Sequence, residues 1–307
     1  MTHTPGADSG LAGRVAIVTG AGRGIGRCHA LLLASHGVKV VVNDYGGSAG
    51  GAGHDTAPAN CVVQEIRDAG GQAVANTDDV ADWDGARRLV ETAIDAFGAL
   101  DVLVNNAGFV RDRMLVNMSG AEWDDVMRVH LRGHFCPTRH AAGYWRDQSK
   151  AGQQPKASVI NTTSTSGLFG KVGQINYGAA KIGLASFTMI AATELSRYGV
   201  RVNAIAPAAR TRLTQGLGGV VDEEVPEGKF DELDPANVSP MAAYLGSAHC
   251  RITGKVFLVV GSQVHLFKPF SIVDRIETTG RWTVADLARE AERFAEVEFD
   301  VGDTFGF

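Results

Sequence analysis

Short, β-branched apolar runs alternate along the chain with longer stretches in which apolar residues recur at the spacing of an amphipathic helix. The apolar runs cover residues 15–19, 38–43, 72–76, 100–105, 157–162, 200–205 and 255–260. Intervening stretches such as 24–37 and 83–98 close on a glycine, as helices often do. Such alternation is typical of a parallel sheet covered on both faces. It predicts a doubly wound α/β fold: a seven-stranded parallel Rossmann-like sheet with helices on both faces.

No break in composition divides residues 11–264, so we expect one domain there, after a flexible N-terminus of residues 1–10. Residues 265–307 are expected to form a C-terminal extension, a loop and then a helix, packing on the same domain or on a partner subunit. The glycine-rich stretch 45–57 predicts a flexible loop. The acidic stretch 208–235 predicts a mobile segment over a site, with a disordered surface loop as the alternative.

Composition narrows the class of protein. The chain has 307 residues, of which 45% are hydrophobic and 21% charged, as in soluble globular proteins. The net charge of -5 offers no basic field for nucleic acid or an anionic membrane. No apolar run approaches the ~20 residues that a membrane helix needs, and the first ten residues lack a signal-peptide pattern. The four cysteines lack zinc-ligand spacing. We therefore expect a cytoplasmic protein with no metal, no nucleic-acid partner and no membrane span.

The segment from Gly20 to Gly26 leaves the first predicted strand and enters the first predicted helix. Glycines there permit a tight turn, and they let backbone N–H groups at a helix start approach a pyrophosphate. Asp44 ends the second predicted strand, where a carboxylate can accept hydrogen bonds from a ribose 2′-OH and would repel a 2′-phosphate. This favours NAD over NADP. Arg23 is a counter-signal, since a cation there could serve a 2′-phosphate, and a turn before Gly46 is the structural alternative for Asp44.

Tyr177 and Lys181 are four residues apart in an amphipathic stretch, which places both side chains on one helical face. A phenol titrates near ~10, so it is a poor base unless a nearby cation such as Lys181 favours the phenolate. Taken alone, the pair is more typical of a surface tyrosine beside a solvated lysine. Ser164, just after the fifth predicted strand, could donate a hydrogen bond to an oxygen whose charge changes during hydride transfer.

These motifs together resemble the short-chain dehydrogenases. The resemblance rests on the spacing Thr-Gly-x-x-x-Gly-x-Gly at 19–26, on Asn-Asn-Ala-Gly at 105–108, on Asp79-Val80 and on Pro207. It implies a catalytic triad of Ser164, Tyr177 and Lys181. It also implies that a nicotinamide cofactor contacts a larger set, which consists of Gly20, Arg23, Gly24, Ile25, Gly26, Asp44, Asp79, Val80, Asn106, Ala107, Gly108, Tyr177, Lys181, Pro207 and Thr211.

His130 departs from the family pattern. Family members often carry an asparagine in this region, as part of a water-mediated proton path from the lysine. An imidazole can also bond water and backbone groups. His130 is therefore either a supporting catalytic residue or a packed histidine.

Three strings, VVNDYGG, VHLRGHF and IAPAARTRLTQ, resemble the (3R)-hydroxyacyl-CoA dehydrogenase domains of peroxisomal multifunctional enzyme type 2 and their bacterial relatives. That resemblance implies oxidation of a (3R)-3-hydroxyacyl-CoA by NAD, in a homodimer or homotetramer. Four arginines are candidates for binding CoA phosphates: Arg111, Arg113, Arg210 and Arg212. The alternatives are a hydroxysteroid or other secondary-alcohol dehydrogenase, a 3-oxoacyl thioester reductase using NADPH, and a cofactor-binding protein without catalysis.

Overall fold

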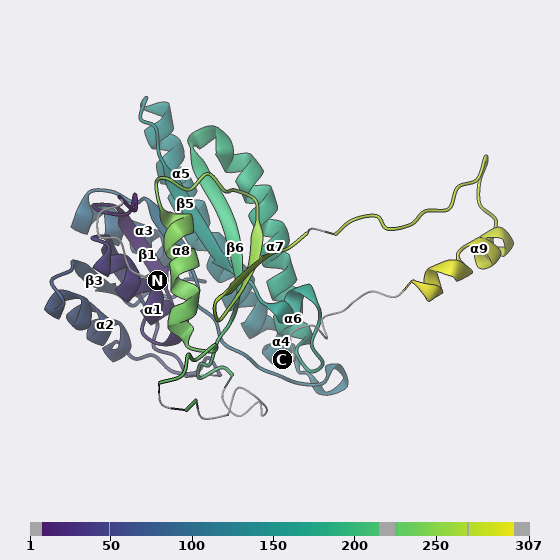
Figure 1. The fold of residues 1–307 in the computed structure, drawn as a ribbon, viewed down its shortest axis with the longest axis horizontal. Coiled ribbons are helices and arrows are strands. Elements are labelled where there is room, and N and C mark those ends of the chain that lie inside the picture. The colour runs from purple at the N-terminus through teal and green to yellow at the C-terminus, as the bar shows by residue number, and fades with distance from the viewer. Residues whose placement is uncertain (1–7, 49, 215–224, 227, 269, 298–307) are drawn as a thin grey trace. The chain divides into compact units, whose positions relative to one another are not determined.

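The computed structural model describes residues 8–48, 50–214, 225–226, 228–268 and 270–297. Its strands form one sheet in the order β3-β2-β1-β4-β5-β6-β7-β8 (Figure 1). Their bounds are β1 (Val15–Thr19), β2 (Lys39–Asn43), β3 (Ala73–Asn76), β4 (Val102–Asn105), β5 (Ala157–Thr162), β6 (Val200–Ala208), β7 (Val256–Val260) and β8 (Gln263–Leu266). The order places β1 and β4 at the switch point of a doubly wound sheet, as predicted.

The prediction of seven strands was wrong, because an eighth follows β7. β8 pairs antiparallel with β7, and Val260 faces Gln263 across a two-residue turn. Gly261 sits in that turn at φ 51°, a backbone conformation that favours glycine. Strand β8 has only four residues, and two of them are polar. It therefore contains no apolar run from which a strand could be predicted.

Helices cover both faces of the sheet, as predicted (Figure 1). Their bounds are α1 (Gly24–Ser35), α2 (Ala57–Asp68), α3 (Trp83–Phe97), α4 (Gly120–Met127), α5 (Gly133–Lys150), α6 (Thr165–Leu168), α7 (Ile175–Leu195), α8 (Ser239–Gly246) and α9 (Val284–Glu290). A single π-turn, η2 (Arg128–Arg132), joins α4 to α5. Short 3₁₀ turns cover Leu115–Asn117, Ser196–Tyr198, Pro235–Val238 and Glu292–Glu296.

Two apolar cores follow from the alternation of side chains along each strand. Val18 of β1 lies in one core with Leu33 of α1 and Leu245 of α8. Ile17, the preceding residue, lies in the other core with Leu89 of α3 and Trp145 of α5. The near-continuous apolar strands are therefore explained by burial on both faces of the sheet.

Buried asparagines end several of the parallel strands. Asn43 of β2 and Asn76 of β3 are register partners, and the Asn43 amide donates to Asn76 Oδ1 at 2.8 Å. Asn105 of β4 and Asn161 of β5 repeat the arrangement at 3.0 Å. These side-chain bonds satisfy polar groups at the carboxyl edge of the sheet, where the candidate site lies.

The chain divides into two compact units, Met1–Leu266 and Phe267–Phe307. In the second unit, Thr283 caps α9 by accepting from the Asp286 amide, and Arg293 bonds to Asp274. The predicted helix of the extension is thus present, while its packing on the domain or on a partner stays a prediction. Residues 1–7 of the predicted flexible N-terminus lie outside the described residues. Nowhere in the described parts of the chain is a helix both long and apolar enough to cross a membrane.

Candidate active site

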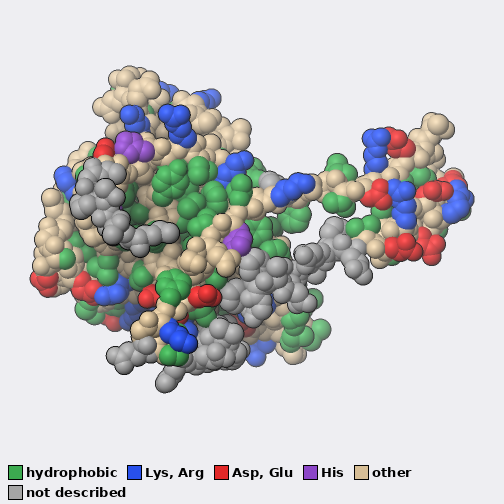
Figure 2. All heavy atoms as spheres, in the orientation of Figure 1, with side chains coloured by type: hydrophobic (Ala, Val, Ile, Leu, Met, Phe, Trp, Pro, Cys, Tyr) green, Lys and Arg blue, Asp and Glu red, His purple; other side chains and the backbone are tan. Residues whose placement is uncertain are grey.

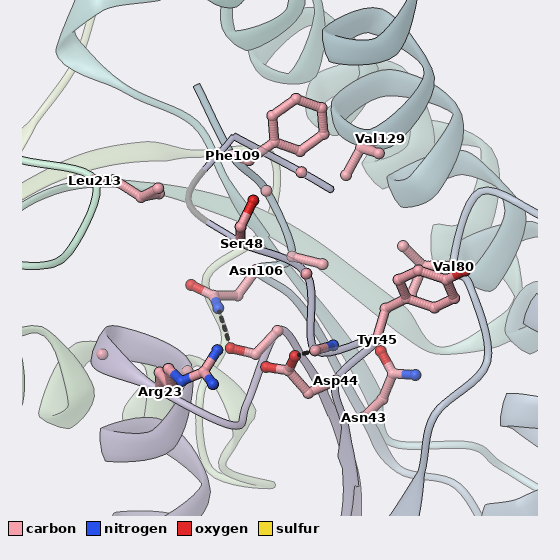
Figure 3. A pocket seen from close by; sticks show the side chains of 18 of the residues that line it. Arg23, Asn43, Asp44, Tyr45, Ser48, Val80, Asn106, Phe109, Val129 and Leu213 are labelled. Atoms are coloured by element: carbon pink, nitrogen blue, oxygen red, sulfur yellow. Dashed lines mark hydrogen bonds between the residues drawn. The ribbon is translucent and has the colours of Figure 1, made fainter. Parts of the chain in front are cut away.

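The glycine turn between β1 and α1 packs tightly against the end of β4 (Figure 3). A Cβ on Gly20 would lie 2.7 Å from Ala107 Cα, and one on Gly26 would lie 2.2 Å from Gly20 O. The Asn106 amide donates to Thr19 O at 3.0 Å and to Gly20 O at 3.2 Å, and so holds the turn in place. Side chains at these two glycines would push the turn off the sheet.

This turn forms one wall of a pocket at the carboxyl ends of the strands. Twelve of the fifteen residues predicted to bind the cofactor line it, namely Gly20, Arg23, Gly24, Ile25, Gly26, Asp44, Asp79, Val80, Asn106, Ala107, Gly108 and Thr211. Tyr177, Lys181 and Pro207 are not among its lining residues. A backbone cradle at the start of α1, with carboxylates further along the sheet edge, fits a nicotinamide dinucleotide.

Several lining residues were missed by sequence reasoning. The loop after β2 contributes Tyr45, Gly46, Gly47, Ser48 and Gly51, and Phe109 and Arg128 line the pocket as well. Their only sequence signal is position, directly after Asp44 and after the Asn-Asn-Ala-Gly motif. The stretch predicted as a flexible loop thus forms part of the pocket wall, although residue 49 lies outside the described residues.

Asp44 braces two backbone turns at once. Its Oδ2 accepts from the Gly22 amide and its Oδ1 from the Gly46 amide, each at 2.7 Å. The turn before Gly46, offered as the structural alternative, is therefore real, and the same carboxylate also lines the pocket. Burial and the nearby Arg23 lower the pKa of Arg212, while Asp44 raises it. Both signs of charge meet at this end of the pocket.

Asp79 has a partner that the sequence did not reveal. Arg128, at the start of the π-turn, donates to Asp79 Oδ2 at 2.6 Å, and the Ala81 amide donates to Asp79 Oδ1 at 2.8 Å. Arg128 and Asp79 both line the pocket. The carboxylate expected to meet an adenine amino group is thus held by a guanidinium from the neighbouring helix.

The three residues predicted as a catalytic triad lie together. Tyr177 and Lys181 share one face of α7, and Lys181 Nζ is 5.3 Å from the centroid of the Tyr177 ring. Ser164, which caps α6, hydrogen-bonds with the Tyr177 side chain. Lys181 is buried and donates to Thr162 O at 2.6 Å.

Burial dominates the proton affinities of this group. It raises the pKa of Tyr177 to about 12, with the Ser164 hydrogen bond acting against it and the Asp112 carboxylate adding to it. Burial also lowers the pKa of Lys181 to about 7. Burial thus acts against the charged form of both groups, and the expectation that a lysine cation favours the phenolate stays a prediction for the enzyme with its cofactor bound.

His130 is buried against Tyr177. The two rings meet edge to face with centroids 5.1 Å apart, and the His130 Nε2 lies 2.7 Å from Phe109 O. A Cβ on Gly108 would lie 2.2 Å from His130 Cε1, so only glycine leaves room for the imidazole there. Burial, followed by the charge of Lys181, holds the pKa of His130 well below its usual value. His130 thus connects the pocket, through Gly108, to Tyr177.

Asn176 fixes the start of α7, and sequence reasoning missed it. Its Oδ1 accepts from the Tyr177 amide at 2.7 Å. Its amide group donates to Arg111 O and to Glu122 O, each at 3.1 Å. A fully buried side chain therefore ties the catalytic helix to α4.

The arginines proposed for CoA phosphates divide into two groups. Arg212 lines the pocket. The other three form ion pairs, Arg111 with Asp125 at 3.0 Å, Arg113 with Glu122 at 3.0 Å and Arg210 with Asp231 at 2.6 Å. These three would have to leave their carboxylates to bind a phosphate.

The segment predicted as a lid begins and ends close together. The Arg210 amide donates to Leu233 O at 2.7 Å, so residues on both sides of the segment meet. Thr211 and Leu213 reach the pocket from it. Residues 215–224 and 227 of the predicted lid lie outside the described residues.

Comparison with known proteins agrees with this geometry. Residues 14–218 match the model of the short chain dehydrogenase family. The chain therefore belongs to the short-chain dehydrogenases, and it is an oxidoreductase that acts on CH–OH groups. Members of this family bind NAD(H) or NADP(H) in their Rossmann-like fold.

Several individual relatives are similar to the chain over most of its length. The chain is 44% identical to the hydroxyacyl-CoA dehydrogenase ChsB1 of Mycobacterium tuberculosis, over 90% of this chain and 87% of that one. It is 46% identical to peroxisomal multifunctional enzyme type 2 of Drosophila melanogaster, over 79% of this chain and 38% of that one. It is also 39% identical to a 3-oxoacyl-[acyl-carrier-protein] reductase of Synechocystis, over 83% of this chain and 98% of that one. Among solved structures, a short chain dehydrogenase from Mycobacterium avium matches with TM-score 0.83 and 49% identity, covering 93% of this chain and 96% of that one.

Proposed function

We propose that the protein oxidises a (3R)-3-hydroxyacyl-CoA to the 3-oxoacyl-CoA with NAD as hydride acceptor. The observation that carries the proposal is the cluster of Ser164, Tyr177 and buried Lys181 beside the dinucleotide pocket. His130 connects the two, since it contacts both Tyr177 and the pocket residue Gly108. The likeness to hydroxyacyl-CoA dehydrogenases supports the choice of substrate.

Tyr177 takes the hydroxyl proton of the substrate in this mechanism. Ser164 holds the substrate oxygen by a hydrogen bond while that oxygen becomes a carbonyl. The nicotinamide, when bound, supplies the acceptor for the hydride. Because the phenol is protonated up to about pH 12 and Lys181 titrates near 7, Tyr177 must pass a proton onward as it receives one. Lys181 is the neighbouring group with the lower proton affinity.

A substrate screen tests the proposal. Reduced cofactor is followed with (3R)- and (3S)-3-hydroxyacyl-CoA thioesters and with free steroid alcohols. Turnover of the (3R) thioester with NAD is the expected result. Turnover of steroid alcohols alone would overturn the CoA assignment. A strong preference for NADPH and a 3-oxoacyl thioester would instead support the synthetic reductase alternative, which the Synechocystis relative favours.

The preference for NAD is assigned to Asp44. Its carboxylate lines the pocket and would repel a 2′-phosphate, although Arg23 and Arg212 lie close by. Asp44→Asn removes the charge and one of the two oxygens that accept from Gly22 and Gly46. Because the lost backbone bond acts on both cofactors alike, the ratio of kcat/KM for NAD to that for NADP should fall about tenfold through the lost charge, or roughly 1.4 kcal/mol of discrimination. An unchanged ratio would count against this role.

We further propose that the protein works in the cytoplasm as a homodimer or homotetramer. Figure 2 shows apolar side chains gathered on the face near α8, where Tyr244, 48% exposed, and Val264 of β8, 53% exposed, line one hollow. Large apolar patches on a soluble protein commonly mark subunit contacts. Light scattering of the purified protein should give twice or four times the monomer mass, and a monomer at micromolar concentration would contradict this.

A further inference from the structure

The π-turn η2 carries two arginines that hold one loop of the pocket wall. Arg128 Nη1 donates to Asp79 Oδ2 at 2.6 Å, and Arg132 Nε donates to the carbonyl oxygen of Ala81 at 2.8 Å. The Ala81 amide in turn donates to Asp79 Oδ1 at 2.8 Å. Two guanidinium groups from one neighbouring segment therefore fix the loop of residues 79–81.

The π-turn also packs closely on this loop. The Gly133 amide donates to Arg128 O, five residues back, which is the hydrogen bond that defines a π-helix. A Cβ on Gly133 would lie 2.9 Å from Val80 Cγ2, so the backbone after the turn lies against the loop. Single π-turns within helices occur frequently at functional sites.

The loop of residues 79–81 lies at the far end of a row of pocket residues along the sheet edge. Strands β1, β2 and β3 are neighbours in the sheet, and the glycine turn, Asp44 and Asp79 follow them in that order. All three features line the pocket. A pyrophosphate at the helix start and a ribose at Asp44 leave the purine base of a dinucleotide at the end of β3. Asp79 and Arg128 are the charged pair at that end.

The Asp79 carboxylate still has room for another donor. An ionised carboxylate accepts at about four lone-pair positions and donates nothing. Arg128 and the Ala81 amide use one position each, so the 6-amino group of an adenine can donate to another. A 6-oxo group would instead meet an oxygen without a proton. The charge-assisted bond from Arg128 fixes the direction in which the carboxylate points.

We propose that Arg128 is a positioning residue for the base of the cofactor. It holds the Asp79 carboxylate in the orientation that accepts a hydrogen bond from a 6-aminopurine and disfavours a 6-oxopurine. Arg128 acts through Asp79 and needs no contact of its own with the base. The inference rests on the proposed binding of a nicotinamide adenine dinucleotide along Asp44 and Asp79, and not on the identity of the alcohol.

A binding measurement without substrate tests this role. Fluorescence titration gives the Kd of NADH and that of reduced nicotinamide hypoxanthine dinucleotide, in which a 6-oxo group replaces the 6-amino group. The wild type should bind NADH about tenfold more tightly or better, as expected for one hydrogen bond to a charged group. Arg128→Met keeps the aliphatic stem and removes the guanidinium. It should lower this preference about threefold, within the range for a half-exposed ion pair.

The ratio of the two Kd values separates positioning from a general loss of charge. Both cofactors carry the same pyrophosphate, so removing a positive charge from the pocket should weaken them by the same factor. Only a change in the orientation of Asp79 should alter the ratio. Arg87→Met is the matched control. Arg87 is 47% exposed and pairs with Glu91 at 2.7 Å, and it is not among the described residues that line the pocket. Both Kd values should stay unchanged in this variant.

A double variant tests whether Arg128 acts through Asp79. Asp79→Asn keeps an oxygen for the Ala81 amide and removes the charge, so its ratio should fall close to 1. Adding Arg128→Met to Asp79→Asn should then leave the ratio unchanged, since the group that Arg128 positions is already lost. A further fall in the double variant would show that Arg128 contacts the base directly, and would overturn the proposal. An Arg128→Met ratio equal to that of the wild type would overturn it too.

A crystal structure of the wild type with cofactor bound gives a test that needs no variant. Arg128 should remain bonded to Asp79, with the 6-amino nitrogen within hydrogen-bond distance of the same carboxylate. A structure in which Arg128 has left Asp79 would overturn the inference.

Failure of this inference and failure of the proposed function are distinguishable. If the wild type binds NADPH rather than NADH, the 2′-phosphorylated forms of both compounds replace these two in the titration. A wild type that binds no reduced nicotinamide dinucleotide would refute the proposed function itself. Equal affinity of the wild type for the adenine and hypoxanthine forms would refute only the role of Arg128.

Discussion

The pocket end of the site and the end that holds Ser164, Tyr177 and Lys181 differ in the groups that shape them. At the pocket end the shape comes from backbone: glycines allow a turn to lie so close to its neighbours that an added Cβ would be only 2.2 to 2.7 Å from the nearest atom. At the reacting end the shape comes from buried polar side chains, among them Lys181, His130 and His134. The pocket end depends on glycines, which have no side chain. The reacting end depends on polar side chains that are buried away from water.

Substitutions at the two ends should therefore have different effects. Adding atoms to the pocket end should weaken cofactor binding and leave the chemistry of bound complexes largely intact. Removing functional groups from the reacting end should slow turnover and leave binding largely intact.

The largest effect is expected at Tyr177. Tyr177→Phe removes the proton acceptor while keeping the ring that packs on His130, so kcat should fall roughly 10²- to 10⁴-fold, the usual contribution of a general acid or base. Steady-state kinetics measures kcat, and fluorescence titration measures cofactor affinity. A large loss of cofactor affinity in this variant would break the separation of the two ends.

The next effect is expected at Gly26. A methyl group in Gly26→Ala would collide with Gly20 O, and overpacking of this kind costs about 1–3 kcal/mol. If about 1.4 kcal/mol of that cost falls on the bound state, the cofactor Kd rises about tenfold, and kcat at saturating cofactor changes little. Gly120→Ala is the matched control, since nothing lies within 4 Å of the added atom there. Equal behaviour of the two variants would contradict the steric argument.

The pH dependence of kcat/KM should show the titration of Lys181. Below about pH 7 the lysine is protonated and cannot take the proton from Tyr177, and above that pH it can. For oxidation, kcat/KM should therefore rise through pH 7, while for the reverse reaction it should fall. Lys181→Met should lack this limb in both directions, whereas Gly120→Ala should keep it. A limb that persists in Lys181→Met would assign the titration to another group.

The smallest effect is expected at Arg113. Its side chain is 53% exposed and paired with Glu122, and the largest cause of that carboxyl's lowered pKa is the Ser119 backbone rather than Arg113. Because exposed ion pairs contribute little, Arg113→Ala should change KM for an acyl-CoA by less than about threefold. A rise of about tenfold would show that Arg113 leaves Glu122 to bind the substrate, and would extend the binding surface beyond the pocket.

Much of the fold was predictable from local pattern. The fifth predicted strand, 157–162, matches β5 residue for residue, and the stretch 83–98 forms α3 with Gly98 as its left-handed cap. Burial on both faces makes such strands continuously apolar, so the pattern is strong. β8 escaped notice because an exposed edge strand needs no apolar run.

The site was predictable as a set of motifs but not as a set of contacts. The spacing of Tyr177 and Lys181 placed both on one helical face, which local geometry dictates. The π-turn that brings His130 to Tyr177, and the Arg128 contact with Asp79, depend on packing between α4 and its neighbours. The pKa values depend on burial, and no spacing of residues along the chain records how much water surrounds a side chain.

The asparagine pair at the ends of β2 and β3 bears on how this protein can change over evolutionary time. Asn43 donates to Asn76, and both side chains are buried. A change at either position strands an amide in the interior, at a cost of about 1–3 kcal/mol. Apolar residues at both positions would also leave the backbone carbonyl and amide of Asp78 without the side chains that bond them. We therefore expect both positions to stay asparagine in descendants of this gene.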